Sequence, residues 1–504
     1  MFEASHPLLL FDYFRVSCRL ITAGDGWSED LPARHPLHSF GQLRWTGDDG
    51  SNRRLYWPVV EGGGSALPEL LAPGEWRLGQ TPIYCRIVPD RASQEWLRAT
   101  DGAWRPDLPI HDARGQHVAS VWRDEHGSLF LPFDPAEAIR NYWSEAYHAI
   151  GQRKLVGHVR KLAVRWYYRV RPALPRSSQI QMRRLFTSLQ ARSRFPRWPI
   201  ETALHDLYAL LLGLAAGLAR APVPWLSFWP NGYGWALVLT HDVETSVGYA
   251  NLSRLRNVEI QAGLHSAWNF VGKRYPVESD VVDDLTRAGC EVGVHGLYHD
   301  GRDLESLARL NERLPAIRAC ARRWHAVGFR SPATQRVWQW MPLLGFDYDS
   351  SYPDTDPFEP QPGGCCSWLP YFNDNLVELP ITLPQDHTLF VILRQTDEAI
   401  WVRKAQHLKQ AGGMALVLTH PDYMLEDRLL QAYARFLQRV RADATVWHAL
   451  PREVSAWWRR RAASRLEWVG DRWTIKGPAA TEGSVQFVHP RDAAAPVTLR
   501  SVLI

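Results

Sequence analysis

The sequence predicts an α/β protein whose central part, residues 231–450, folds as a distorted (β/α) barrel. From Trp235 onward, short apolar runs alternate with amphipathic stretches of helical periodicity, which is the pattern of parallel βα units. Several of these runs end abruptly in charged or imidazole side chains, as barrel strands do where they form a site. The length of 504 residues exceeds a single hydrophobic core, so we expect further domains.

We expect residues 1–139 to form a β-rich N-terminal domain, because Gly, Pro and Trp separate short alternating runs such as HVASVW and SLFLPF. A helix should begin after Asp134, which is placed to cap it, with Pro135 in the first turn. Residues 140–230 read as a basic helical connecting segment. Its apolar stretch LYALLLGLAAGL is too short to span a bilayer, which takes about 20 residues. This stretch therefore predicts a buried helix.

The connecting segment carries a one-sided charge, with 13 Lys or Arg and no Asp or Glu between Arg153 and Arg197. Such a run can contact phosphates of an anionic membrane surface or of a lipid-linked sugar. Alternatively, it docks onto the more acidic remainder of the chain or is a solvated face, since Trp166, Tyr167 and Leu174 interrupt the charges. We expect no nucleic-acid partner, because no known binding module surrounds the run.

Six strands and three long helices are expected within the barrel. The strand candidates are 236–241, 265–271, 291–295, 325–329, 377–382 and 415–420, and the helix candidates are 279–289, 303–324 and 396–413. Gly289 and Gly412 are placed to end two of the helices. We expect residues 451–504 to form a C-terminal helix and a small β-containing tail.

Composition constrains the compartment. The chain is 45% hydrophobic and 22% charged, as in a folded soluble protein. Its six cysteines show no CxxC spacing, which favours reduced thiols. The first residues lack the basic start of a secretory signal, so we expect a cytoplasmic protein. A peripheral contact of this protein with the inner membrane face is a second expectation. The 24 Trp residues could stack on sugars or simply pack.

Four of the predicted strand ends carry side chains suited to hydrolytic metal chemistry. They are Asp242 with Glu244, His295 with His299 in VHGLYHD, Arg330 in GFRSP, and His420 in VLTHPD. An i, i+4 histidine pair lies on one side of a turn entering a helix, and two imidazoles with one carboxylate leave coordination positions open, as in catalytic sites. Each feature alone has a structural explanation, such as a helix cap or a surface ion pair. Their convergence at one barrel mouth favours a site.

In this order the motifs resemble those of polysaccharide deacetylases of the NodB-homology type, carbohydrate esterase family 4. The resemblance covers roughly residues 235–450. HGLYH resembles the family's HTxxH, with Gly296 in place of the hydroxyl residue; GFRSPA resembles RxPY, with Ala333 in the Tyr position; and LVLTHPD resembles LxH. PFDPAEAIRNYW also resembles the segment before the deacetylase domain in larger members. The resemblance implies a NodB-type barrel, a preceding extra domain and a divalent metal ion, first Zn²⁺, with Co²⁺, Ni²⁺, Mn²⁺ or Fe²⁺ as alternatives.

The sequence departs from the family at its first motif. The usual TFDDG has two adjacent Asp residues, one serving as base and the next as metal ligand, whereas this chain reads THDVE. Asp242 matches the first Asp and Val243 replaces the second. Either Glu244 supplies the missing ligand, or Asp242 is itself the ligand and the base comes from elsewhere. Asp349 and the adjacent Asp386 and His387 are the spare candidates, which we interpret as substrate-binding residues.

The resemblance implies a reaction and the role of each residue. A metal ion polarises an acetamide carbonyl and activates water; Asp242 acts as general base, Arg330 orients it, and His420 protonates the departing amine. The predicted enzyme is a metal-dependent N-deacetylase acting on an amino-sugar polymer or its lipid-linked precursor, with residues 153–197 touching a membrane surface. Two alternatives stay open. One is a non-catalytic carbohydrate-binding or assembly protein, and the other is a hydrolase of an imide, ureide or peptide amide.

Overall fold

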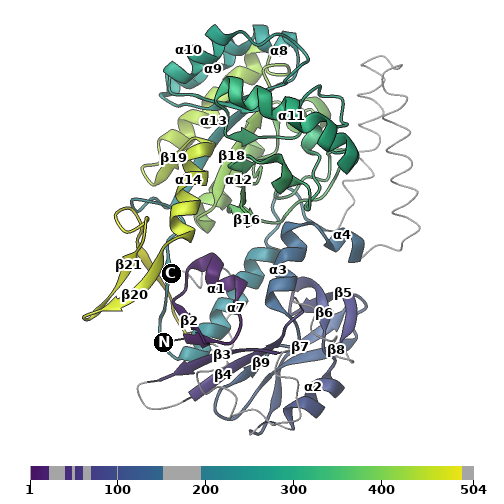
Figure 1. The fold of residues 1–504 in the computed structure, drawn as a ribbon, viewed down its shortest axis with the longest axis vertical. Helices are drawn as coiled ribbons and strands as arrows, with labels where there is room; N and C mark the ends of the chain where they lie inside the picture. Colours follow the sequence, from purple (N-terminus) through teal and green to yellow (C-terminus); the bar gives the residue numbers. More distant parts are fainter. Residues whose placement is uncertain are drawn as a thin grey trace. The chain divides into compact units, whose positions relative to one another are not determined.

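The structure, a computed structural model, describes residues 2–21, 40–47, 52–60, 70–98, 100, 102–150 and 195–490 (Figure 1). The chain divides into two compact units. The first comprises Met1–Gly157, Thr202–Phe228 and Arg461–Ile504, and the second comprises His158–Glu201 and Trp229–Arg460. Nearly all of the basic run, up to residue 194, lies outside the described residues, so its predicted membrane contact stays a prediction.

The first unit contains a nine-stranded mixed sheet in the order β2-β1-β3-β4-β9-β8-β7-β5-β6. Its strands are β1 (Phe2–Ala4), β2 (Cys18–Leu20), β3 (Phe40–Thr46), β4 (Asn52–Pro58), β5 (Leu71–Leu78), β6 (Thr81–Ile87), β7 (Arg105–Asp112), β8 (His117–Arg123) and β9 (Leu129–Phe130). A buried cluster of Tyr56, Trp96, Leu97, Trp122 and Phe130 packs together. These Trp residues therefore serve as packing material rather than as sugar platforms.

Helices α1 (Leu9–Phe14), α2 (Asp90–Leu97), α3 (Pro135–Trp143), α4 (Tyr147–Ile150) and α7 (Ala203–Ala219) complete this part of the unit. The predicted start of α3 is confirmed, because the Asp134 side chain accepts a hydrogen bond from the backbone N–H of Ala136 and Pro135 occupies the first turn. The apolar stretch near residue 210 lies in α7, which is largely buried as predicted. Among the described residues, no helix combines the length and the apolar character needed to cross a membrane.

The C-terminal residues of the first unit form two small antiparallel pairs. Strand β10 (Val223–Leu226) pairs with β22 (Val485–Val488), and β20 (Arg465–Val469) pairs with β21 (Arg472–Lys476). The buried guanidinium of Arg461 donates to the carbonyl oxygens of Tyr13, Leu226 and Ser227 at 2.7, 2.7 and 2.9 Å. One side chain thus ties together three segments that are far apart in the sequence.

The second unit contains a sheet in the order β16-β17-β15-β14-β13-β12-β11-β18, with β19 paired to β11. All ladders are parallel except that of β16 with β17. The strands are β11 (Trp235–Val243), β12 (Ala267–Phe270), β13 (Glu291–Val294), β14 (Gly328–Phe329), β15 (Tyr348–Asp349), β16 (Tyr371–Asn373), β17 (Leu376–Glu378), β18 (Met414–Thr419) and β19 (Val446–His448). The predicted parallel βα architecture is confirmed.

The sheet curls toward a barrel without closing by a regular ladder. Beyond β17 the chain approaches β18, where Leu383 N donates to the Leu416 carbonyl at 3.0 Å and Thr382 Oγ1 donates to the Met414 carbonyl at 2.6 Å. These bonds join the segment that follows β17 to the edge strand β18. The barrel is therefore distorted, because one of its seams is held by single bonds rather than by a strand pair.

Helices α8 (Ser246–Ala250), α9 (Leu252–Ala262), α10 (Ser279–Arg287), α11 (Leu307–Trp324), α12 (Ala399–Ala411), α13 (Asp427–Arg441) and α14 (Pro451–Ala462) surround this sheet (Figure 1). Gly412 ends α12 with φ +67°, as predicted. The predicted strands at 325–329 and 377–382 are shorter in the structure, since β14 has two residues and β17 has three. All six cysteines are free, in agreement with reduced thiols.

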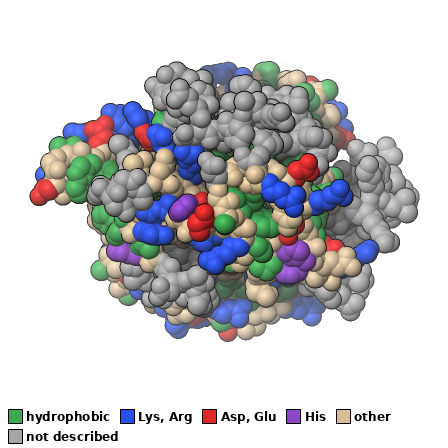
Figure 2. Space-filling view, turned by 90° about the horizontal axis from the view of Figure 1, so that it is seen from below, with side chains coloured by type: hydrophobic (Ala, Val, Ile, Leu, Met, Phe, Trp, Pro, Cys, Tyr) green, Lys and Arg blue, Asp and Glu red, His purple; other side chains and the backbone are tan. Residues whose placement is uncertain are grey.

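The molecular face in Figure 2 shows Lys and Arg side chains scattered among acidic and hydrophobic ones. Within the described part of that face, basic side chains do not gather into one continuous patch.

Candidate metal centre and active site

The end of β11 distributes its side chains by strand alternation, in which successive residues point to opposite faces. Asp242 and Glu244 line a pocket at the carboxyl end of the sheet. His241 and Val243, which alternate with them, are fully buried and do not line it. His241 instead bonds Glu259 at 2.7 Å and Thr419 at 2.8 Å. Val243 stands at the position of the second Asp of the family motif. Its side chain lies on the side away from the pocket.

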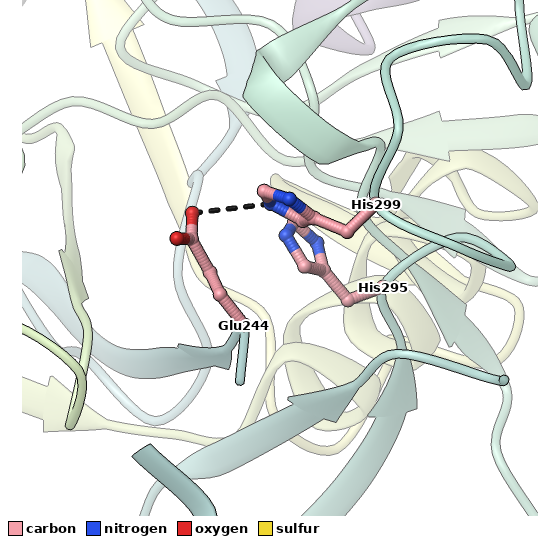
Figure 3. A group of neighbouring side chains, drawn as sticks. All are labelled: Glu244, His295 and His299. Atoms are coloured by element: carbon pink, nitrogen blue, oxygen red, sulfur yellow. Dashed lines mark ion pairs between the residues drawn. The ribbon is translucent and has the colours of Figure 1, made fainter. Parts of the chain in front are cut away.

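Glu244, His295 and His299 form a group that could hold a metal ion (Figure 3). One ligand atom from each lies within 4.8 Å of the other two. His299 Nε2 is 3.1 Å from Glu244 Oε1, and the ring centres of His295 and His299 are 5.0 Å apart. The side chains come from the carboxyl ends of β11 and β13. Strand β12 lies between these two strands in the sheet.

The protonation states of this group suit a cation. His295 Nε2 is buried without a hydrogen-bond partner within the described residues, which is costly unless an ion or water satisfies it. His299 Nε2 has Glu244 Oε1 as its contact. The other nitrogen of His295, Nδ1, lies 3.1 Å from the Arg330 carbonyl oxygen, and this contact favours the tautomer that leaves Nε2 as a lone pair. Burial lowers the pKa of His295 to about 4, so its imidazole is neutral near pH 7.

The carboxylate of the group is held in its charged form. Burial raises the pKa of Glu244, but the charge and the hydrogen bond of His299 lower it more, so its net pKa lies well below the ordinary value. Tyr423 OH donates to Glu244 Oε2 at 2.6 Å. Two imidazoles and an ionised carboxylate are the donor set that divalent transition metals accept.

The turn between the two histidines explains a departure from the family motif. Gly296 has φ +67°, and a Cβ there would lie 2.4 Å from Asp303 Oδ2 and 2.6 Å from Pro332 Cγ. A side chain at this position is excluded both by conformation and by space. His299 also has a positive φ, of 55°, which is uncommon for a non-glycine residue and is found at functional sites.

Asp242 lies on one side of the metal-binding group. Its side chain is 2% exposed and is surrounded by hydrogen-bond donors. Asn269 Nδ2 donates to its Oδ1 at 2.8 Å and Arg330 Nη1 donates to the same oxygen at 3.2 Å. Its other oxygen lies 3.5 Å from His295 Nδ1. Burial raises the pKa of Asp242, but His295, Arg330 and His420 together lower it further, so the net pKa lies below the ordinary value. Asp242 is thus an ionised carboxylate near neutral pH.

His420 lies on the other side, at the end of β18. Its Nδ1 is 2.6 Å from Asp386 Oδ1, and its backbone N–H donates to Asp386 Oδ2 at 2.7 Å. Burial lowers the pKa of His420, but Asp386, Glu244 and Asp242 outweigh this and raise it to about 10. Nε2 lies 3.9 Å from Glu244 Oε1. His420 is therefore a protonated imidazolium that faces the pocket.

The three predicted substrate-binding residues lie in different environments. His387 lines the pocket, and Asp386 lies behind His420 as the partner that orients it. Asp349 is fully buried, does not line the pocket, and accepts a bond from Ser351 Oγ at 2.7 Å. Burial raises the pKa of Asp349, as it does that of neighbouring Glu378. Asp349 therefore lies outside the lining of this pocket, and its interpretation as a substrate-binding residue stays a prediction.

Several residues of the site carry no local sequence signal. Asn269 is a lone polar residue within β12, and Glu359 and Gln385 line the pocket from irregular segments. Asp422 accepts from the Glu244 N–H at 2.9 Å and from Thr245 Oγ1. Asp422 and Tyr423 could have been found from their place directly after LTH in HPDY, which puts them beside the same strand end.

A comparison with solved structures finds similar chains that align with about half of this one. Similar solved structures include a protein described as a polysaccharide deacetylase from Mycobacterium smegmatis, with 19% identity, a TM-score of 0.39 and coverage of 48% of this chain and 96% of that one. A family 4 carbohydrate esterase from Streptomyces lividans, in complex with acetate, shows 14% identity, a TM-score of 0.29 and coverage of 44% and 93%.

A family 4 acetyl xylan esterase from Clostridium thermocellum, in complex with a cobalt ion, shows 12% identity, a TM-score of 0.31 and coverage of 44% and 91%. No family model matches the chain, and no curated protein matches it. Because the identities and TM-scores are low, the function is argued below from the pocket itself.

Proposed function

We propose that the chain is a metal-dependent hydrolase that removes an N-acyl group, first of all acetyl, from an amino sugar of a polysaccharide or of its precursor. One observation carries this proposal. A group of Glu244, His295 and His299, in which His295 Nε2 is buried without a hydrogen-bond partner among the described residues, lies between an ionised carboxylate and a protonated imidazole. Hydrolysis of an amide requires a base and an acid placed in this way.

The metal ion would be held by Glu244 Oε1, His295 Nε2 and His299 Nε2, with Zn²⁺ as the first candidate. A divalent ion supplies Lewis acidity, which polarises a carbonyl oxygen and makes water more acidic. Three protein ligands leave positions open, which distinguishes a catalytic centre from a structural one. Tyr423 and Asp422 hold Glu244 from its side chain and its backbone, respectively, and thereby fix the carboxylate for this role.

Asp242 would act as general base. Its lowered pKa keeps it ionised and able to accept a proton from the attacking water. Arg330 and Asn269 both donate to Oδ1, which restrains the rotation of the carboxylate and leaves Oδ2 on the side of His295. Arg330 is itself held by Ser350 and Thr240, so the base is oriented by a fully bonded guanidinium.

His420 would act as general acid. An amine leaves an amide carbon readily only after its nitrogen is protonated, and His420 carries that proton because Asp386 stabilises the imidazolium. The carboxylate of Asp386 also accepts the backbone N–H of His420. Two bonds to one residue fix both the ring and the strand end that carries it.

The test is metal content together with acetate release. Purified protein should contain about one equivalent of zinc, cobalt, nickel or iron, and should release acetate from N-acetylglucosamine oligomers in a reaction that a chelator stops and added metal restores. Protein that binds metal and cleaves only imides, ureides or peptide amides would reject the sugar substrate. Protein that binds sugar without holding any metal would reject the enzyme altogether.

A further inference from the structure

The hairpin of β20 (Arg465–Val469) and β21 (Arg472–Lys476) has an apolar face that runs from the core of the first unit to an exposed tip (Figure 1). We propose that this face, through Trp468 and Trp473, docks on the surface of a lipid bilayer that contains anionic headgroups. The proposal concerns the first unit alone and does not depend on the hydrolase site. It also uses other residues than the membrane contact predicted for residues 153–197.

The register of the hairpin separates its side chains into two faces. Leu466 pairs with Ile475, and Trp468 pairs with Trp473. Residues that pair across an antiparallel ladder, or that lie two apart along a strand, share a face. One face of the hairpin therefore consists of these four apolar side chains. The opposite face carries the three basic side chains of the two strands, which are Arg465, Arg472 and Lys476. The hairpin is thus amphipathic.

The apolar face begins in the core and ends in solvent. Leu466 at the base of the hairpin is 2% exposed, whereas Trp468 near the turn is 58% exposed. Trp473, its cross-strand partner, is half-buried. The base is fixed, because Ser464 Oγ accepts a hydrogen bond from the Ala479 N–H at 2.9 Å. Two indole rings are therefore presented to solvent on a strand pair that is anchored at its other end, and large exposed apolar side chains of this kind indicate an interaction surface.

The geometry of the ring pair favours a bilayer over other partners. The Trp468 and Trp473 rings lie 5.4 Å apart at an interplanar angle of 70°, so they do not form one flat platform on which a sugar chain could stack. A second protein copy is disfavoured by area. Two Trp side chains bury at most about 500 Å², whereas a stable interface buries about 800 Å² per partner. A bilayer interface requires neither a common ring plane nor a minimum area, and it is where Trp side chains gather.

The charges of the polar face determine the headgroup. Glu467 is the single acid within the two strands and bonds Arg465 at 2.7 Å. Arg472 and Lys476 are exposed on the same face, and Asp471 lies in the turn. With the indoles in the interface, the long basic side chains of the opposite face can extend to the phosphates. The surplus of basic over acidic groups therefore favours anionic lipids.

The experiment measures sedimentation of the full-length protein with vesicles of phosphatidylcholine, with or without phosphatidylglycerol. We expect the wild type to bind the mixed vesicles, and Trp468→Ala/Trp473→Ala to weaken the partition coefficient by at least about tenfold, because two aromatic side chains no longer leave water. Arg472→Gln/Lys476→Gln should weaken binding to the mixed vesicles by about fivefold per charge. The same pair should leave binding to phosphatidylcholine alone unchanged.

Two matched controls lie elsewhere on the surface. Tyr233→Ala removes an aromatic side chain that is 37% exposed, and Arg114→Gln removes an exposed cation between β7 and β8. Both should bind vesicles as the wild type does, and near-ultraviolet circular dichroism verifies the fold of every variant. Brominated phosphatidylcholine in the mixed vesicles should quench a part of the wild-type Trp emission that is missing from Trp468→Phe/Trp473→Phe.

Three results overturn the inference. They are absence of wild-type binding to the mixed vesicles, equal binding by the folded Trp468→Ala/Trp473→Ala protein, and failure of the brominated lipid to quench these two residues. If the protein does not bind vesicles but forms a lipid-free dimer, or holds N-acetylglucosamine oligomers, in a way that the Ala pair abolishes, the surface has that partner instead. Acetate release is not part of the measurement, so failure here leaves the proposed function untouched.

Discussion

The Nε2 atom of His295, which has no hydrogen-bond partner among the described residues, separates this histidine from an ordinary structural one. A buried imidazole in a protein core normally donates and accepts with its neighbours, as His241 does with Glu259 and Thr419. His295 instead has one nitrogen directed at the Arg330 carbonyl and the other without a bond among the described residues. The difference predicts which histidines bind metal.

His295→Ala should therefore lose the metal ion. Removing one of three ligands weakens affinity by far more than the 10- to 100-fold typical of an outer partner, so dialysed variant protein should retain well under one equivalent, measured by elemental mass spectrometry. His111→Ala in the first unit serves as control and should keep the wild-type stoichiometry. Retention of a full equivalent by folded His295→Ala would place the metal elsewhere.

Asp386→Asn should move the alkaline limb of the pH–rate profile. The pKa of His420 is raised to about 10 in the folded protein. Wild-type His420 therefore stays protonated as the pH rises, and it loses the proton that it donates as general acid only near pH 10. Without the Asp386 charge and hydrogen bond, the largest contributions that oppose burial are lost, so the pKa of His420 falls. We expect kcat at pH 8 to fall by about a hundredfold or more.

The control is Asp397→Asn, the same change at an exposed residue that accepts the Ala399 N–H. Its profile should match that of the wild type. An unshifted alkaline limb in folded Asp386→Asn, measured as kcat against pH, would exclude His420 as the general acid.

At the scale of the element, β11 decides which carboxylate can reach the metal-binding group. A sequence pattern alone leaves this open, because whether Val243 or its neighbours face the pocket depends on the register of the strand in the sheet. In the structure Asp242 pairs with Asn269 of β12, and Asp242 and Glu244 line the pocket together. The shift of the second carboxylate from position 243 to 244 thus follows from the two-residue repeat of a strand.

Val243→Asp, which restores the family's adjacent Asp pair, should destabilise the protein without adding a ligand. Val243 is fully buried on the side away from the pocket, so a carboxylate there is desolvated without a partner, at a cost of about 3–5 kcal/mol. Urea unfolding measures this cost, and Val247→Asp, at an exposed position, should change stability by less than about 0.5 kcal/mol. Higher metal affinity in folded Val243→Asp would contradict the assigned register.

The elements show what a sequence can and cannot predict here. Strand and helix positions in the second unit follow from periodicity, and the gathering of Asp242, His295, Arg330 and His420 follows from parallel strands having their carboxyl ends at one edge. The partners of these residues were not predictable. Asn269, Glu359 and Gln385 reach the pocket through tertiary packing of single polar residues that belong to no repeated pattern. Asp349 looked like the other strand-end acids, but burial against Glu378 places it away from the pocket.

On the scale of the whole second unit, the two ends of the parallel sheet have different roles. The carboxyl ends of the strands carry the candidate site, whereas the amino end of β13 carries Glu291, which accepts from Tyr348 OH at 2.8 Å and from the Arg452 N–H at 3.0 Å. These bonds link β13 to β15 and to the start of α14. A buried carboxyl group at this end of the sheet is expected to affect stability rather than catalysis.

This carboxyl group predicts how stability depends on pH. Burial raises the pKa of Glu291 from its ordinary value of 4.5 to about 7. Since the folded state binds the proton more tightly than the unfolded state, the contribution of Glu291 is fully present below about pH 4.5 and is lost as the pH rises through 7. Glu291→Gln cannot titrate, so its stability relative to the wild type should increase between pH 5 and pH 8, by up to about 3 kcal/mol.

Urea unfolding followed by Trp fluorescence at both pH values measures the difference, with the exposed Glu305→Gln as a control that should show none. A difference that is the same at pH 5 and pH 8 would mean that Glu291 is ionised throughout, and that Tyr348 and the Arg452 N–H solvate its charge well enough to offset burial.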